Sequence, residues 1–133
     1  MIVADVNLVA YLLIDGEHTE AAQAALAKDP EWAAPLLWRS EWRNILAGYL
    51  RRAELDLDQA LERMAVAESL FRGREFASEG RRVMQLVATS DLSAYDCEYA
   101  ALADHLGVPL VSNDTQLVEA FPGRAQLLSE FTA

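Results

Sequence analysis

Short apolar runs alternate along this chain with longer segments in which apolar residues recur at helical spacing. The short runs are rich in residues that favour strands. They lie at residues 1–5, 32–35, 108–112 and 125–128, with a further short strand near Phe76. Between them, spacings of three and four predict helices. The predicted helices span residues 8–15 with Asn7 as N-cap, then 17–28, 36–52, 57–71, 79–88, 93–106 and 114–120.

This alternation predicts an α/β fold with three layers, α/β/α, around a central and mainly parallel sheet. No repeat, low-complexity tract or linker divides the sequence, so we expect one domain over residues 1–133. Ligands of such folds gather beyond the carboxyl ends of the strands. Functional side chains are therefore expected directly after the predicted strands.

Length and cysteine content are those of an ordinary domain that needs no disulfide. The chain has 133 residues and a single cysteine, Cys97. It cannot form an internal bridge, and no Cys and His cluster has zinc-ligand spacing, so a reducing compartment, the cytoplasm, is expected. Acidic residues interrupt each apolar run and no basic leader segment opens the chain, so we expect neither a secretion signal nor a membrane span.

The net charge of −10 is unevenly distributed. The two ends of the chain are strongly acidic, whereas residues 39–82 contain nine arginines against eight acids. These arginines are Arg39, Arg43, Arg51, Arg52, Arg63, Arg72, Arg74, Arg81 and Arg82. Two interpretations remain open: a rim that faces phosphate, supplied by the central helices, or solvated helix faces with local ion pairs.

Four acids mark the places where the pattern changes. Asp5 ends the first strand, Asp114 follows a late strand, Glu41 lies between two tryptophans, and Asp96 lies near the start of a helix. Carboxylates suit Mg²⁺ or Mn²⁺, and such ions can drive hydrolysis of a phosphodiester. A nuclease is therefore the leading hypothesis.

Each of these acids could instead stabilise the fold without binding metal. Asp5 and Asp114 can bond to the free N–H groups at the start of the next helix. Glu41 can pair on the surface with Arg39 or Arg43. Asp96 has capping-box spacing from a serine three residues earlier, and Glu98 nearby offers a spare carboxylate.

Three segments together resemble the PIN domain, and most closely its VapC-like toxin ribonucleases. These segments read IVADVNLVAYLL, PLLWRSEWRNILAGYL and LSAYDCEYAALADHLGVPLVSNDTQL, and they are spread over nearly the whole chain. The residues that match the family pattern are Asp5 with Asn7, Glu41 with Asn44, Asp96, and Ser112 with Asp114.

The resemblance implies an endoribonuclease dependent on Mg²⁺ or Mn²⁺, with Asp5, Asp96 and Asp114 as metal ligands. Glu41 would bind metal or orient the attacking water. It also implies a homodimer and a cognate antitoxin protein whose tail covers the acidic site. Some members carry another acid two residues after the last aspartate, where this chain has Gln116. Clustered acids without metal are expected to show raised and coupled pKa values.

Two other functions are weighed against a nuclease. A non-catalytic domain could receive an arginine-rich peptide in the same acidic cleft. A phospho-acceptor receiver domain expects adjacent acids after the first strand and a lysine after a late strand, whereas the only lysine here is Lys28. We place His18, His105 and Cys97 outside the site. Trp38, Trp42 and Tyr95 could stack on bases, but core or interface packing is the favoured interpretation.

Overall fold

Five short parallel strands form the centre of the fold in a computed structural model that describes all of residues 1–133. The strands are β1 (Ile2–Ala4), β2 (Trp32–Pro35), β3 (Glu75–Phe76), β4 (Leu110–Ser112) and β5 (Ala125–Leu127). Their order across the sheet is β3-β2-β1-β4-β5, and every neighbouring pair is parallel. The predicted α/β fold with a mainly parallel sheet is confirmed.

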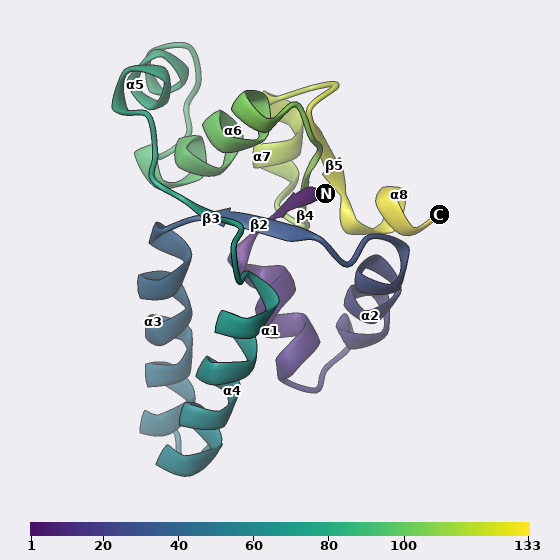
Figure 1. The fold of residues 1–133 in the computed structure, drawn as a ribbon, viewed down its shortest axis with the longest axis vertical. Helices are drawn as coiled ribbons and strands as arrows, with labels where there is room; N and C mark the ends of the chain where they lie inside the picture. Colours follow the sequence, from purple (N-terminus) through teal and green to yellow (C-terminus); the bar gives the residue numbers. More distant parts are fainter.

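Helices cover both faces of this sheet (Figure 1). The eight helices are α1 (Val6–Leu13), α2 (Thr19–Lys28), α3 (Leu37–Arg51), α4 (Leu57–Leu70), α5 (Gly80–Ala88), α6 (Ala94–Leu106), α7 (Thr115–Ala120) and α8 (Leu128–Thr132). Figure 1 shows α1 to α4 below the sheet and α5 to α7 above it, with α3 and α4 extending side by side away from the strands. None of these helices combines the length and the apolar character needed to cross a membrane.

The strand order reverses direction at β1, the central strand. Val3 is in register with Ala33 of β2 on one side and with Leu110 of β4 on the other. The chain builds outward through β2 and β3, then returns to the opposite side of β1 to add β4 and β5. In open parallel sheets such a switch point leaves a crevice beyond the strand ends, where ligands bind.

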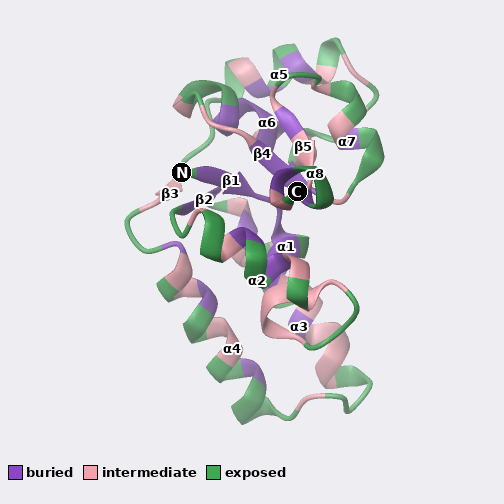
Figure 2. Cartoon of the chain, turned by 90° about the vertical axis from the view of Figure 1, so that its right-hand side faces the viewer, coloured by how far each residue is buried: buried purple, intermediate pink, exposed green.

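The core is continuous across the sheet. All three residues of β1 and all four of β2 are buried, as expected for strands covered on both faces. Trp32, Trp38, Trp42 and Phe71 are the largest fully buried side chains. Figure 2 shows the buried residues concentrated in the strands and on inward helix faces, while the far end of α4 is mostly exposed and that of α3 mostly intermediate. Core packing of Trp38 and Trp42 is therefore confirmed, whereas Tyr95 is 62% exposed.

Two details of the elements differ from the predictions. The N-cap of α1 is Asp5, not Asn7, because the Asp5 carboxylate accepts the backbone N–H of Asn7. Helix α8 was not predicted, because its five residues are too few to show a helical period. It is held by tertiary contacts: Leu128 and Phe131 are buried, and Lys28 donates a hydrogen bond to the Phe131 carbonyl.

Candidate functional site

Asp5 lies at the end of β1, at the switch point of the sheet, and is one of only two buried polar or charged residues. Its side chain is 9% exposed. Oδ1 accepts the Asn7 N–H at 3.3 Å, and Oδ2 accepts the Ser112 hydroxyl at 2.7 Å. Both carboxylate oxygens therefore have a donor, which is what a buried acid requires. The cap and the contact with β4 hold the carboxylate in one orientation.

Ser112, the last residue of β4, connects two of the predicted acids. While its hydroxyl donates to Asp5, the same oxygen accepts the backbone N–H of Asp114 at 3.0 Å. Asp114 is exposed and caps α7, accepting the N–H groups of Gln116 at 3.0 Å and Leu117 at 3.3 Å. The N-cap predicted for Asp114 is thus present. Because only one of its oxygens takes part in capping, the other remains available to a ligand.

Asp96 lies in the first turn of α6. Its backbone N–H donates to the Ser93 hydroxyl at 3.1 Å, which is half of the predicted capping box. The reciprocal bond, from the Ser93 N–H to the Asp96 carboxylate, is not made. The half-buried carboxylate therefore makes no bond to the backbone of the N-cap residue.

Glu41 takes its partner from α6 rather than from its own helix. Its Oε1 accepts a hydrogen bond from the Tyr99 hydroxyl at 2.7 Å. The surface pairing with Arg39 that the sequence left open is wrong, because Arg39 instead contacts Glu75 and Glu68. Tyr99 was missed by the sequence analysis. Its position three residues after Asp96, and so on the same face of the helix, was the available signal.

Three further predicted residues surround this centre. Asn7 and Asn44 are exposed, Asn7 beside Asp5 and Asn44 one turn after Glu41 on α3. Glu98 is half-buried and accepts a hydrogen bond from the Ser78 hydroxyl. Glu98 also interacts electrostatically with Glu41. Its carboxylate is thus tied to the loop before α5, a contact that the sequence did not reveal.

The acids are close enough to disturb one another's protonation. Burial raises the pKa of Asp5, and the charges of Asp96 and Asp114 raise it further against the opposing hydrogen bonds. Burial also raises the pKa of Glu41, with added repulsion from Asp5, Asp96 and Glu98. Burial and the charge of Asp114 raise the pKa of Asp96. These directions agree with the expectation of coupled acids in a site without metal.

The donor set is one of hard oxygens, which suits Mg²⁺ or Mn²⁺. No three Asp, Glu, His or Cys side chains are arranged so that they could enclose a metal ion directly. Mg²⁺ usually keeps several waters and binds through one or two carboxylates, so these oxygens fit a hydrated ion. The carboxylates available at this edge of the sheet are those of Asp5, Asp96, Asp114 and Glu41, whose charges interact.

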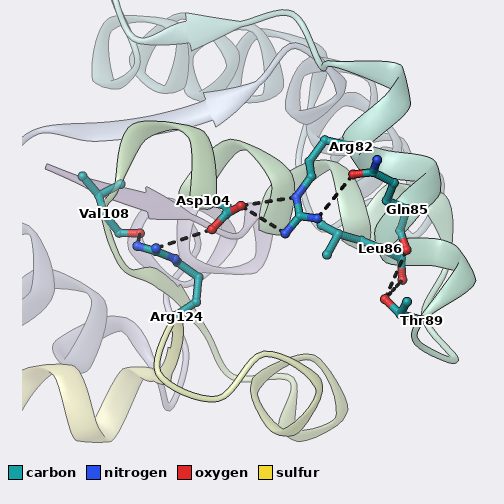
Figure 3. A network of polar contacts seen from close by, with 7 residues as sticks. All are labelled: Arg82, Gln85, Leu86, Thr89, Asp104, Val108 and Arg124. Atoms are coloured by element: carbon teal, nitrogen blue, oxygen red, sulfur yellow. Dashed lines mark hydrogen bonds and ion pairs between the residues drawn. The ribbon is translucent and has the colours of Figure 1, made fainter.

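Most of the central arginines are already engaged. Arg39 and Arg52 pair with acids, and Arg63 and Arg74 donate to backbone carbonyls. Arg82 on α5 pairs with Asp104 on α6, which also contacts Arg124, so that one acid joins two arginines (Figure 3). The four that remain exposed and unpaired are Arg43, Arg51, Arg72 and Arg81. A phosphate-facing surface would thus draw on these four residues.

The fold and this edge of the sheet define a three-layer α/β/α domain with a carboxylate cluster at its topological switch point. Residues 2–121 match the PIN domain family, and this chain belongs to that family. It is similar to Ribonuclease VapC3 of Pyrobaculum aerophilum, with 28% identity over 124 residues that cover 91% of this chain and 95% of the relative.

Solved structures show the same fold at 20% identity. PAE2754 from Pyrobaculum aerophilum superposes with a TM-score of 0.77, covering 98% of this chain and 85% of that one. A toxin-antitoxin complex from Klebsiella pneumoniae gives a TM-score of 0.71, covering 96% and 98%. FitAcB from Neisseria gonorrhoeae gives 0.72, covering 90% and 92%.

Proposed function

We propose that this chain is a metal-dependent endoribonuclease toxin that hydrolyses RNA phosphodiester bonds and is neutralised by a cognate antitoxin. The observation that carries the proposal is the carboxylate cluster at the switch point, where Asp5, Asp96, Asp114 and Glu41 interact electrostatically. Membership of the PIN domain family and similarity to a ribonuclease support the same reaction. The proposed nuclease domain spans residues 1–133.

The residues of the cluster would have different roles in metal binding, water orientation and RNA contact. Asp5, Asp96 and Asp114 would hold Mg²⁺ or Mn²⁺, which when bound supplies an activated water and stabilises charge on the phosphodiester. Glu41, oriented by Tyr99, would bind the same ion or orient the attacking water. Asn7 and Asn44 are exposed beside these acids and would contact the RNA backbone.

An antitoxin partner is supported by the neighbours of the fold, one of which is a toxin-antitoxin complex. A basic side chain of the partner would contact the acidic cluster. Without a cation, the carboxylates repel one another and the Asp5 carboxylate is buried, and both effects disfavour the charged forms. The homodimer and the cytoplasmic location stay predictions from the sequence. Sedimentation of the purified chain tests the first of these.

The alternative functions differ from the proposed one in whether the chain cuts RNA. Membership of the PIN domain family removes the phospho-acceptor receiver domain. A non-catalytic domain with an acidic cleft would bind the antitoxin but leave RNA intact. The deciding experiment incubates the isolated chain with single-stranded RNA and Mg²⁺ or Mn²⁺ and sequences the cut ends. Cleavage that EDTA abolishes supports the proposal, whereas intact RNA under all of these conditions supports the non-catalytic alternative.

A further inference from the structure

A cavity of about 340 Å³ lies beside the acidic cluster, between α1, the turn that follows it, the start of α2, and α3. Asn7 lines one end, and this residue also donates its backbone N–H to Asp5. The cavity therefore begins where the carboxylate cluster ends. None of the residues proposed to hold metal forms its wall.

Three aromatic rings line this cavity, namely those of Tyr11, His18 and Tyr49. Tyr11 and His18 lie with ring centroids 4.6 Å apart and planes inclined at 48°. All three residues are only partly buried. Ile14 and Ile45 add apolar surface to the wall. Aromatic and apolar walls of this kind accept a flat unsaturated ring.

Polar groups are placed around this aromatic wall. Asp15 and Glu17 also line the cavity and can accept hydrogen bonds from the amino groups of a base. The guanidinium of Arg52 lies 4.7 Å from the centroid of the Tyr49 ring, and it is already paired with Glu54. A ring to stack on and acceptors for amino groups together match the base of one nucleotide of a single strand.

We propose that this cavity binds one nucleobase of single-stranded RNA next to the phosphodiester that is cut. The assignment rests on the proposed ribonuclease function and deepens it by naming where the substrate's sequence is read. Tyr49 and His18 provide the stacking surface, and Asn7 connects the base to the cleavage centre.

A second cavity fits a base less well. It has a volume of about 480 Å³ and lies between the loop before α6 and helix α7. Its wall holds no aromatic residue, and Asp91 and Glu119 give it negative charge without a ring to stack against. This cavity supplies the matched control, through the exposed Glu119.

The test measures RNA affinity and asks whether removing one side chain changes the effect of removing one base. Sequencing of the ends cut from an RNA pool first defines the preferred site. Fluorescein-labelled RNA decamers carrying that site, each with a single abasic position, are then titrated with Asp5→Asn protein in Mg²⁺. Removing the base that occupies the cavity is expected to weaken binding roughly 5- to 150-fold, the range measured for stacked bases.

The same abasic change should have little effect when the protein also carries Tyr49→Leu or His18→Leu, because the stacking surface is already lost. Tyr49→Phe keeps the ring and should behave like the parent, and Glu119→Gln should leave the coupling unchanged. The assignment is overturned if the abasic position weakens binding equally in the parent and in both leucine variants. It is also overturned if only Glu119→Gln changes the effect of the abasic position.

A wrong ribonuclease proposal would give a different result from a wrong base-binding proposal. If the unmutated chain cuts no RNA, the ribonuclease proposal fails, and the binding titrations with decamers of random sequence still measure whether Tyr49 couples to a base. Circular dichroism melts of each variant identify any that fail to fold. Because Tyr49 and His18 lie on different elements, α3 and the start of α2, loss of one variant leaves the other as the test.

Discussion

The Tyr99 hydroxyl donates a 2.7 Å hydrogen bond to Oε1 of Glu41 across 58 positions of sequence. Burial and the neighbouring Glu41 carboxylate raise the pKa of Tyr99 well above its usual value, so the phenol stays protonated and acts only as a donor toward the carboxylate. Tyr99 is 2% exposed, and it links helix α6 to helix α3 beside the acidic cluster. One Glu41 oxygen is thereby fixed, and the other makes no hydrogen bond within the protein.

Tyr99→Phe should lower the cleavage rate without abolishing it. The variant keeps the buried ring but frees Glu41 to rotate, and it leaves a half-buried carboxylate without its donor. Loss of a hydrogen bond to a charged group costs about 1.5 to 3 kcal/mol of stability. Urea denaturation and steady-state kinetics measure the two effects. A stability loss with unchanged kcat would mean that the bond serves the fold alone.

Asp5→Asn should reduce cleavage by roughly 100-fold or more, the scale of removing a group that acts on the transition state. Stability at pH 7 should be retained or increased, because the raised pKa of Asp5 means that its charged form is disfavoured in the folded protein. Asp56→Asn, at the N-cap of α4, is the matched control for loss of one charge and should cleave normally. Normal cleavage by Asp5→Asn would contradict the proposed ligand set.

Mn²⁺ should raise the melting temperature of the unmutated chain, because an ion that binds only the folded state adds RT ln(1 + [M]/Kd) to its stability. At 100 times the dissociation constant this is about 2.7 kcal/mol. Asp96→Asn should show a much smaller rise. Differential scanning calorimetry with and without EDTA measures it, and equal shifts in both proteins would place the ion elsewhere.

Glu75 should make stability depend on acid pH. Hydrogen bonds from Arg39 lower the pKa of this carboxyl, with Trp38 Nε1 donating to the same group at 2.6 Å. A lowered pKa contributes stability that is present above the usual value near 4.5 and is lost as the pH falls through the folded value. Between pH 7 and 3, Glu75→Gln should therefore lose less of its unfolding free energy than the unmutated chain.

At pH 7 the same variant should be less stable by about 1.5 kcal/mol, because Arg39 loses its charged acceptor. Glu54→Gln removes a pair with Arg52 in which both side chains are more than half exposed, and should change little. Urea titrations of the three proteins at each pH provide the comparison. Parallel pH curves for the unmutated chain and Glu75→Gln would refute the assignment.

Two positions with positive φ should respond in opposite directions. Gly107 ends α6 at φ 68°, and Gly107→Ala should cost about 1 to 2 kcal/mol because a Cβ disfavours this conformation. Ala53 has φ 56°, so Ala53→Gly should be neutral or slightly stabilising. Thermal melts measure both. Destabilisation by Ala53→Gly would mean that the Ala53 methyl group contributes packing that outweighs its backbone strain.

The sequence predicted the strands and most helices because their apolar periods and their Gly or Pro boundaries are local signals. The C-terminal helix was missed, since Leu128 and Phe131 become helical through burial against the rest of the fold. The acids could be named from position and family pattern. Their partners could not be predicted, because the Asp5 contact with Ser112 spans 107 positions and depends on strand order.

That long separation has a consequence for the protein during its own synthesis. Asp5 leaves the ribosome 107 positions ahead of Ser112 in β4, and Asp114 emerges after Ser112. Closing the β1–β4 pair joins distant segments and is a late, slow kind of step. Until it closes, the acids belong to separate pieces of chain. A nascent polypeptide that has not yet reached β4 therefore has no assembled carboxylate cluster, and the proposed cleavage of RNA, including the message that encodes the chain, would have to wait for that step.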